Sequence, residues 1–273
     1  MKKTFLIIFL LSLVIMACQQ ELPKNGIVVI SPELAEIIVK IAGDGQIIGV
    51  TEECNFPQIL QFKEKVGNFG QVNLEKIALL RPEYVITSSL EQEGVAKDLE
   101  KLGIKVISIY PKSIDEMFAA ITELGIITKT EKNAEKLISE LKEDIDELKN
   151  YQPKNPKKVF VEIYNDPIMS VSAESYIGSL VELAGGINIF PVLERDYSRV
   201  KNESIILANP DVIITTYPGI DKDTIKNRKG WEHINAVKNN EIYTIEDVNP
   251  DLIVRATPRN IEGVKLLRSV IYE

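Results

Sequence analysis

Several residue types on which catalytic and nucleic-acid-binding proteins depend are scarce in this chain. It has 273 residues but one histidine, His233, and two cysteines, Cys18 and Cys54. A single histidine cannot form a two-histidine zinc site, and the HExxH pattern is missing from the sequence. The formal net charge of -8 disfavours nucleic acid, because such binding depends on basic patches. We therefore expect no metal site and no nucleic-acid partner.

The common enzyme motifs are also missing. The sequence contains neither a GxxxxGK(S/T) phosphate loop nor a GxSxG nucleophile elbow. The stretch from Gly43 to Gly49 reads GDGQIIG, which departs from the GxGxxG spacing and predicts a turn. Cys54 has no evident cationic partner that would activate a thiolate. We expect no catalytic residues, no cofactor and no enzyme activity; a chelatase-like or hydrolytic α/β enzyme at the cell surface is the alternative.

Residues 1–17 have the pattern of an export signal. Lys2 and Lys3 precede an apolar run at residues 5–16, which is too short for an ordinary membrane span. The run ends in Ile-Met-Ala-Cys, and the cysteine after the expected cleavage position resembles the lipobox of bacterial lipoproteins. The resemblance implies lipid on Cys18, a tether at residues 18–25, and a protein anchored at the extracytoplasmic face of the cell membrane or in the periplasm. A plain membrane anchor or an uncut signal is the alternative.

An internal repeat organises the rest of the chain. Residues 75–89 read EKIALLRPEYVITSS and residues 203–217 read ESIILANPDVIITTY, and the two stretches align without a gap. Each predicts a short helix, a turn at proline and a buried strand. Two copies are too few for a solenoid, so they indicate two similar lobes that face each other across a cleft.

Strands and helices alternate within each half, which is typical of mainly parallel sheets covered on both faces. We predict an N-terminal α/β lobe at residues 26–127 and a C-terminal α/β lobe at 151–273. A single bridging helix at 128–150 would join them, beginning at a capping box from Thr128 to Glu131. Its apolar stripe lies on one face of a charged helix: Ala134, Ile138, Leu141, Ile145 and Leu148. Because a single helix connects the two lobes, we expect no large hinge closure.

Candidate ligand-binding residues follow the predicted strands, because open α/β sheets bind ligands at the carboxyl ends of their strands. They mix aromatic rings, hydroxyls and a few charges, which suits a large ligand with flat and polar surfaces. Ordinary turn chemistry is the alternative for any one of them. The set is Ser31, Thr51, Phe56, Phe69, Ser88, Tyr110, Tyr164, Tyr217, Asp251 and Arg255.

Several motifs in order along the chain resemble one family. They are VVISPELAEI, IIGV and CNFP within residues 26–57, VGNFGQVNLEKIALLRPEYVI at 66–86, LAGGINIF at 183–190, GWEHINAVKNNEIY at 230–243 and RATPRNIEGVKLL at 255–267. The chain resembles the class III periplasmic binding proteins that serve ABC importers of cobalamin, ferric siderophores and haem. The resemblance covers nearly all of residues 26–273. It implies a monomeric binding protein whose partner is an ABC permease dimer with its ATPase subunits.

Within that family the CNFP loop, the Asn165-Asp166-Pro167 turn, and Asp251 four residues before Arg255 resemble the cobalamin-binding members most. The implied ligand is cobalamin or a related corrinoid, with haem and ferric siderophores as alternatives. The resemblance also implies that Glu75 and Glu203 pair with arginines of the permease. Their alternative role is as acidic residues that favour a helix start, and that of Arg255 is a salt bridge to Asp251 that only braces the loop.

Overall fold

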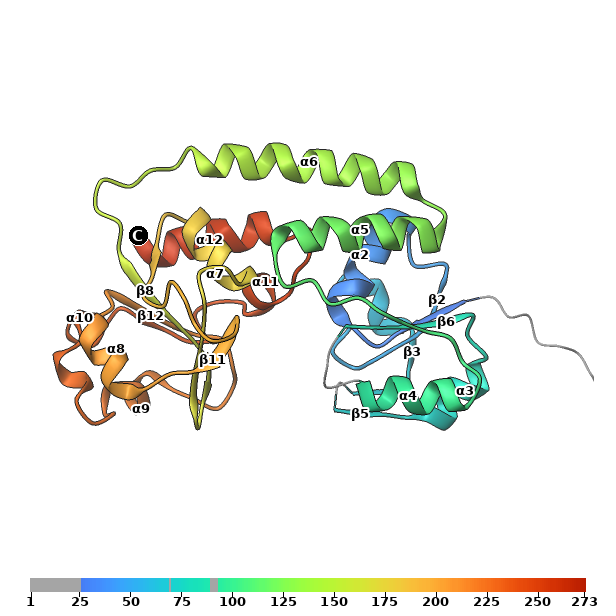
Figure 1. Cartoon of the computed structure of the whole chain (residues 1–273), viewed down its shortest axis with the longest axis horizontal. Helices are drawn as coiled ribbons and strands as arrows, with labels where there is room; N and C mark the ends of the chain where they lie inside the picture. The colour runs from blue at the N-terminus through green and yellow to red at the C-terminus, as the bar shows by residue number, and fades with distance from the viewer. Residues whose placement is uncertain (1–25, 69, 89–92) are drawn as a thin grey trace, which may run out of the picture.

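Each half of the chain folds around its own β-sheet (Figure 1). The computed structural model describes residues 26–68, 70–88 and 93–273. Within these ranges no helix combines the length and apolar character needed to cross a membrane. Cys18 and Phe69 lie outside the described residues, so lipid attachment to Cys18 and ligand binding by Phe69 remain predictions.

The N-terminal lobe is built on a fully parallel sheet of five strands in the order β3-β2-β1-β6-β7. The strands are β1 (Ile27–Val29), β2 (Ile47–Val50), β3 (Glu64–Lys65), β6 (Tyr84–Thr87) and β7 (Val106–Ser108). Val28 faces one side of the sheet and Val29 the other, and both are fully buried. Burial on both faces explains why β1 and β2 are continuous apolar runs rather than alternating ones.

Helices cover both faces of this sheet. On one side lie α2 (Pro32–Ala42) and α5 (Ile114–Thr128), and on the other α3 (Leu74–Leu80) and α4 (Glu93–Lys101). Ser31 caps α2, because its hydroxyl accepts a hydrogen bond from the Leu34 amide at 3.3 Å. Smaller elements connect them: η1 (Gln58–Phe62), β4 (Gly67–Asn68) and β5 (Gln71–Val72).

The bridging helix is α6 (Glu131–Lys149), which passes over both lobes (Figure 1). Its buried side chains are Ala134, Leu137, Leu141, Ile145 and Leu148, so Leu137 is buried where the predicted stripe had Ile138. The predicted capping box is wrong. Thr128 is the last residue of α5, and its hydroxyl donates backwards to the Leu124 carbonyl at 2.7 Å. Thr130 is the N-cap residue and makes no side-chain capping bond.

The C-terminal lobe has a six-stranded mixed sheet in the order β11-β9-β8-β12-β13, with β10 paired to the start of β8. The strands are β8 (Lys158–Asn165), β9 (Ile168–Val171), β10 (Ile187–Asn188), β11 (Tyr197–Arg199), β12 (Val212–Thr215) and β13 (Ile242–Tyr243). Strand β9 runs antiparallel to both of its neighbours, β8 and β11, and the sequence prediction missed this. The Asn165-Asp166-Pro167 turn closes a β8–β9 hairpin rather than leading into a helix.

Seven short or medium helical segments complete this lobe among the described residues. They are α7 (Tyr176–Leu183), α8 (Asn202–Ala208), α9 (Lys222–Lys226), η3 (Trp231–His233), α10 (Asn235–Lys238), α11 (Asp251–Val254) and α12 (Asn260–Tyr272). The last helix begins at Asn260, because Pro258 and Arg259 form a turn before it.

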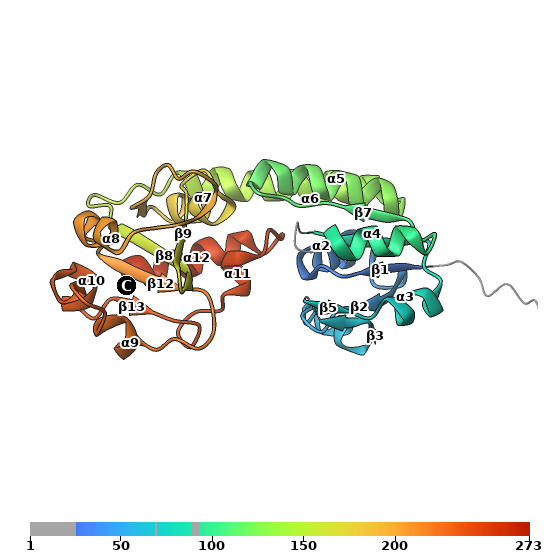
Figure 2. The same cartoon turned by 60° about the horizontal axis from the view of Figure 1, so that its bottom comes forward.

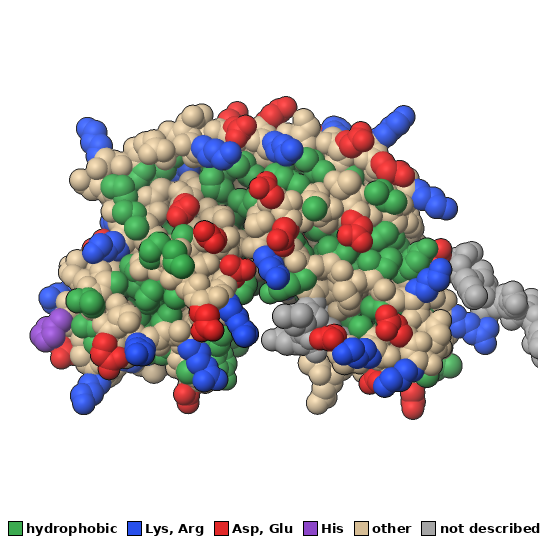
Figure 3. Space-filling model, viewed as in Figure 1, with side chains coloured by type: hydrophobic (Ala, Val, Ile, Leu, Met, Phe, Trp, Pro, Cys, Tyr) green, Lys and Arg blue, Asp and Glu red, His purple; other side chains and the backbone are tan. Residues whose placement is uncertain are grey.

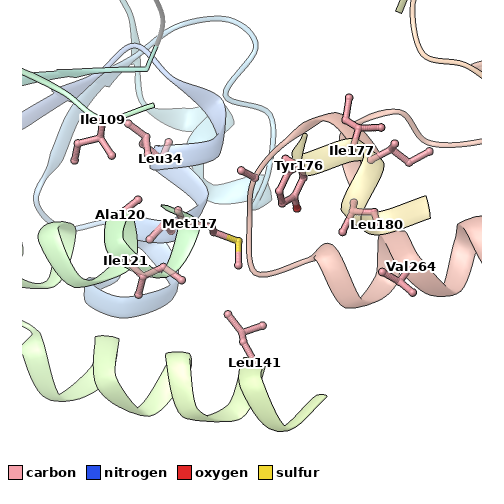
Figure 4. Packing of buried hydrophobic residues seen from close by; sticks show 14 of the residues in the cluster. Leu34, Ile109, Met117, Ala120, Ile121, Leu141, Tyr176, Ile177, Leu180 and Val264 are labelled. Atoms are coloured by element: carbon pink, nitrogen blue, oxygen red, sulfur yellow. The ribbon is translucent and has the colours of Figure 1, made fainter. Parts of the chain in front are cut away.

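A single apolar cluster runs from one lobe into the other. Figure 4 shows Met117 of α5 and Leu141 of α6 between Leu34 of the N-terminal lobe and Leu180 and Val264 of the C-terminal lobe. All five side chains are at most 4% exposed. One continuous core therefore links the two lobes through α5 and α6.

The repeat seen in the sequence is also a structural repeat. Helices α3 and α8 each end at a left-handed residue, Arg81 at φ 47° and Asn209 at φ 49°. The following strands, β6 and β12, each pair in parallel with the first strand of their lobe. The predicted α/β class with two similar lobes joined by one long helix is therefore confirmed.

Candidate functional site

A cleft of about 620 Å³ lies between the two lobes. Figure 2 shows the two lobes side by side, and the space-filling view of Figure 3 shows a notch between them on the side away from α6. The N-terminal lobe contributes residues that follow β1, β6 and β7, as expected for the carboxyl ends of parallel strands. The lining residues are Pro32, Glu33, Glu53, Ser88, Tyr110, Pro111, Ile163, Met169, Tyr176, Ile177, Tyr197, Thr216, Val254, Arg255 and Ala256.

Three of the predicted ligand-binding residues line this cleft. Ser88 follows β6, Tyr110 follows β7, and Arg255 reaches the cleft from the opposite lobe after α11. Tyr110 is 42% exposed, so its ring is accessible to a ligand. The structure therefore brings together residues that are far apart in the sequence, from both lobes.

Six other predicted residues do not line the cleft, although one of them, Asp251, contacts a lining residue, since its carboxylate lies 3.0 Å from Arg255. Ser31 and Thr51 are fully buried; Ser31 caps α2, and the Thr51 hydroxyl lies 3.5 Å from the Cys54 sulfur. Phe56 packs under the Arg259 guanidinium, 4.0 Å from the ring centroid, and lines a separate hollow beside α6. Tyr164 and Tyr217 form a ring pair on the C-terminal lobe, with centroids 6.3 Å apart.

Twelve lining residues are outside the predicted set, and four of them have side chains that bear on what the cleft can bind. Met169 lies in β9, and it was missed because the hairpin was missed. Tyr176 and Tyr197 come from α7 and β11, and burial raises the pKa of both phenols. Glu33 lies in the first turn of α2. Tyrosine spacing alone carries no signal, but a strand prediction for residues 168–171 would have placed Met169 here.

Arg255 connects the two lobes at the edge of the cleft. Its Nη1 donates to Glu36 and to Asn55, each at 3.0 Å. Its Nη2 donates to the Glu53 carbonyl at 3.1 Å and lies 3.0 Å from the Asp251 carboxylate. Both terminal nitrogens are therefore engaged, and four of the five guanidinium donors have partners in the protein.

Arg259 binds the carboxylate of Glu36 as well. Its Nε and Nη2 donate to the two oxygens of Glu36 at 2.7 and 2.6 Å, a bidentate geometry. The Glu36 side chain is 3% exposed, and those of Arg255 and Arg259 are 10% and 13% exposed. This group, which we call the inter-lobe junction, consists of Glu36, Asp251, Arg255 and Arg259. Its formal charges cancel.

A second buried carboxylate organises the C-terminal lobe. Glu162 of β8 has a side chain with no exposed area and accepts bonds from Arg228 at 2.5 and 2.7 Å. The Tyr217 hydroxyl also donates to it. Burial and the adjacent carboxylate raise the pKa of Tyr217, so this phenol stays protonated. Glu162 thus ties the segment after α9, through Arg228, and the loop after β12, through Tyr217, to strand β8.

Glu75 and Glu203 lie at matching places in the two lobes. Each is an exposed residue in the first turn of its helix, α3 or α8. Figure 1 shows both helices on the side of the molecule away from α6. The docking role of these two glutamates remains a prediction.

The described residues contain no group of three or more histidine, cysteine, aspartate or glutamate side chains arranged to hold a metal ion. Cys54 is buried, and burial raises its pKa to about 11. A thiol with such a pKa is protonated at neutral pH and is a poor nucleophile. The cleft lining offers aromatic rings, hydroxyls, two carboxylates and one arginine that is already bonded.

Comparison with known proteins identifies the family. A family model described as periplasmic binding protein matches residues 27–248. The chain therefore belongs to the periplasmic binding protein family, as the sequence motifs indicated.

Individual relatives extend over most of the chain. An uncharacterized ABC transporter substrate-binding lipoprotein of Bacillus subtilis, YvrC, is 32% identical over 92% of this chain and 80% of its own length. A vitamin B12-binding protein of Vibrio cholerae is 25% identical over 89% of this chain and 87% of its own length. The crystal structure of Staphylococcus aureus IsdE complexed with heme superimposes with a TM-score of 0.79 at 25% identity, covering 92% of this chain and 100% of IsdE.

Proposed function

We propose that this protein is a lipid-anchored, extracytoplasmic substrate-binding protein that delivers cobalamin or a related corrinoid to an ABC importer. The names of two relatives, a substrate-binding lipoprotein and a vitamin B12-binding protein, support this assignment. So does the cleft between two lobes, which has the size of a small-molecule site. The lipid would be carried by Cys18, and the partner would be a permease dimer with its ATPase subunits.

The choice of ligand rests on the hydrogen bonds that Arg255 makes within the protein. Among the cleft-lining residues that the structure describes, it is the one cation, and Glu33 and Glu53 are two anions. Both terminal nitrogens of Arg255 are bonded within the protein. A ligand with exposed carboxylates would find little compensation for its desolvation there.

A corrinoid suits this lining better than haem does. Its periphery carries mainly neutral amides, which tyrosine hydroxyls and serine can bind by hydrogen bonds. Its flat ring system suits contact with aromatic side chains such as Tyr110. Haem carries two propionates, and catecholate siderophores are anionic as well.

Haem or a ferric siderophore is the second candidate ligand, because the fold also matches that of a haem complex. Isothermal titration calorimetry of the purified protein, residues 18–273, against cyanocobalamin and haemin separates the two. We expect cyanocobalamin to bind at least tenfold more tightly than haemin. Tighter binding of haemin would overturn the choice of ligand while leaving the class of protein intact.

We further propose that Glu75 and Glu203 dock the protein onto basic residues of the two permease subunits. Their exposure and their equivalent positions in the two lobes support this role. Changing both to arginine should abolish ligand uptake and leave ligand binding in solution intact. Normal uptake by the double variant would exclude this docking role.

A further inference from the structure

Each copy of the structural repeat exposes one leucine to solvent. Leu79 of α3 is 78% exposed and Leu207 of α8 is 88% exposed. The two residues occupy the same position in the gapless alignment of the repeat, four residues after Glu75 and Glu203. In each helix the isoleucine two residues earlier, Ile77 or Ile205, is fully buried. The core of each lobe is thus complete without the leucine.

Isolated exposed apolar residues are normal on protein surfaces and need no explanation. These two differ because they repeat together with a carboxylate. Residues four apart on a helix lie on the same face, so each lobe presents a glutamate and a leucine side by side. Neither Glu75 nor Glu203 has a side-chain partner among the described residues. We call each combination, Glu75 with Leu79 and Glu203 with Leu207, a Glu–Leu pair.

The duplication of the Glu–Leu pair restricts what can cover it. The two pairs lie one per lobe, on α3 and α8, and Figure 1 shows both helices on the side of the molecule away from α6. A partner that covers both pairs needs two similar receptor sites. A two-fold symmetric dimer provides them, since its subunits present the same surface twice. The complementary chemistry is a basic side chain beside an apolar depression, because the carboxylate needs a cation and the leucine needs burial.

We propose that Leu79 and Leu207 are apolar anchors, each of which inserts into a depression on one permease subunit beside the basic residue that pairs with the neighbouring glutamate. This inference rests on the proposed function and extends it from charge pairing to hydrophobic docking. The charges steer the encounter, and the two leucines slow dissociation.

The test measures binding to the cognate permease–ATPase complex reconstituted in nanodiscs of phosphatidylcholine and phosphatidylglycerol. The variants are Leu79→Gln, Leu207→Gln, the double Leu variant and Glu75→Gln/Glu203→Gln. Glutamine keeps the length and the helix preference of leucine while removing its apolar end. Ile126→Gln is the matched control, because Ile126 is a 60% exposed helical residue on α5, outside both repeats.

We expect each single leucine variant to lose roughly tenfold in affinity and the double variant roughly a hundredfold, since the sites are separate. The dissociation rate should carry most of the change. Ile126→Gln should bind like the parent, and cyanocobalamin binding should be unchanged in all variants.

The outcomes separate this inference from the proposed docking role of the glutamates. If the Glu variant loses affinity and the Leu variants do not, the anchors are refuted and the charge docking stands. If neither set has an effect, both proposals fail. If the Leu variants lose affinity equally for nanodiscs without permease, the leucines contact lipid and the proposed permease depressions are refuted.

Discussion

Replacing Glu36 by glutamine tests the inter-lobe junction. The side chain of Glu36 is 3% exposed and is bonded by Arg255 at 3.0 Å and by Arg259 at 2.6 and 2.7 Å. Glutamine keeps the volume but removes the charge, and it leaves two nearly buried guanidinium groups facing a neutral amide. Breaking a buried ion pair by removing one partner costs roughly 3–5 kcal/mol. Asp251 still compensates Arg255, so we expect a loss of about 3 kcal/mol in the free energy of unfolding.

Urea unfolding followed by circular dichroism measures this loss as a lower midpoint at an unchanged slope. Glu140→Gln is the control, because Glu140 belongs to an exposed pair with Lys136, 3.6 Å apart, and should change little. Equal midpoints for the parent and Glu36→Gln would refute the reasoning. A second readout concerns the ligand. The variant frees donors of Arg255, so the ratio of haemin affinity to cyanocobalamin affinity should be higher for Glu36→Gln than for the parent.

Three further predictions concern the lipid on Cys18, the ligand site and the contact with the permease. Cys18→Ser should release the protein from the membrane or leave the signal uncut, as fractionation and the mass of the mature protein will show; a membrane-bound, normally processed variant would contradict lipidation. Phe69→Ala should weaken cyanocobalamin binding by roughly 1–3 kcal/mol if Phe69 is a central anchor. Arg255→Ala should weaken it too, because the guanidinium that holds Glu36 and the Glu53 carbonyl at the edge of the cleft is lost. Calorimetry that finds both variants as tight as the parent would place the site elsewhere. Glu75→Arg/Glu203→Arg should bind ligand normally but fail in uptake, measured with radiolabelled cyanocobalamin in cells.

Local signals determined the elements that the sequence predicted well. Helix α2 has a serine cap, a proline at its first position and a glycine at its end, so its range could be assigned from chemistry alone. The repeat supplied a second line of evidence for α3 and β6. The β8–β9 hairpin was missed because the expectation of a parallel sheet favoured a helix after each strand.

The candidate site was only partly predictable because position after a strand does not determine which way a side chain faces. Ser31 and Thr51 follow strands as predicted, yet both turn into the protein. The pairing of Glu36 with Arg255 joins residues 219 positions apart, across two lobes. No local pattern encodes such a contact, and only the folded arrangement shows that Arg255 is already engaged.

The identity of the bound molecule is the most direct test of the proposed function. Protein purified from its native host without denaturation should be examined by absorption spectroscopy and by mass spectrometry of the released ligand. We predict a corrinoid spectrum and the mass of a cobalamin or of a related corrinoid. A Soret band with the mass of haem, or a ferric chelate, would contradict the assignment of the ligand and the charge argument based on Arg255.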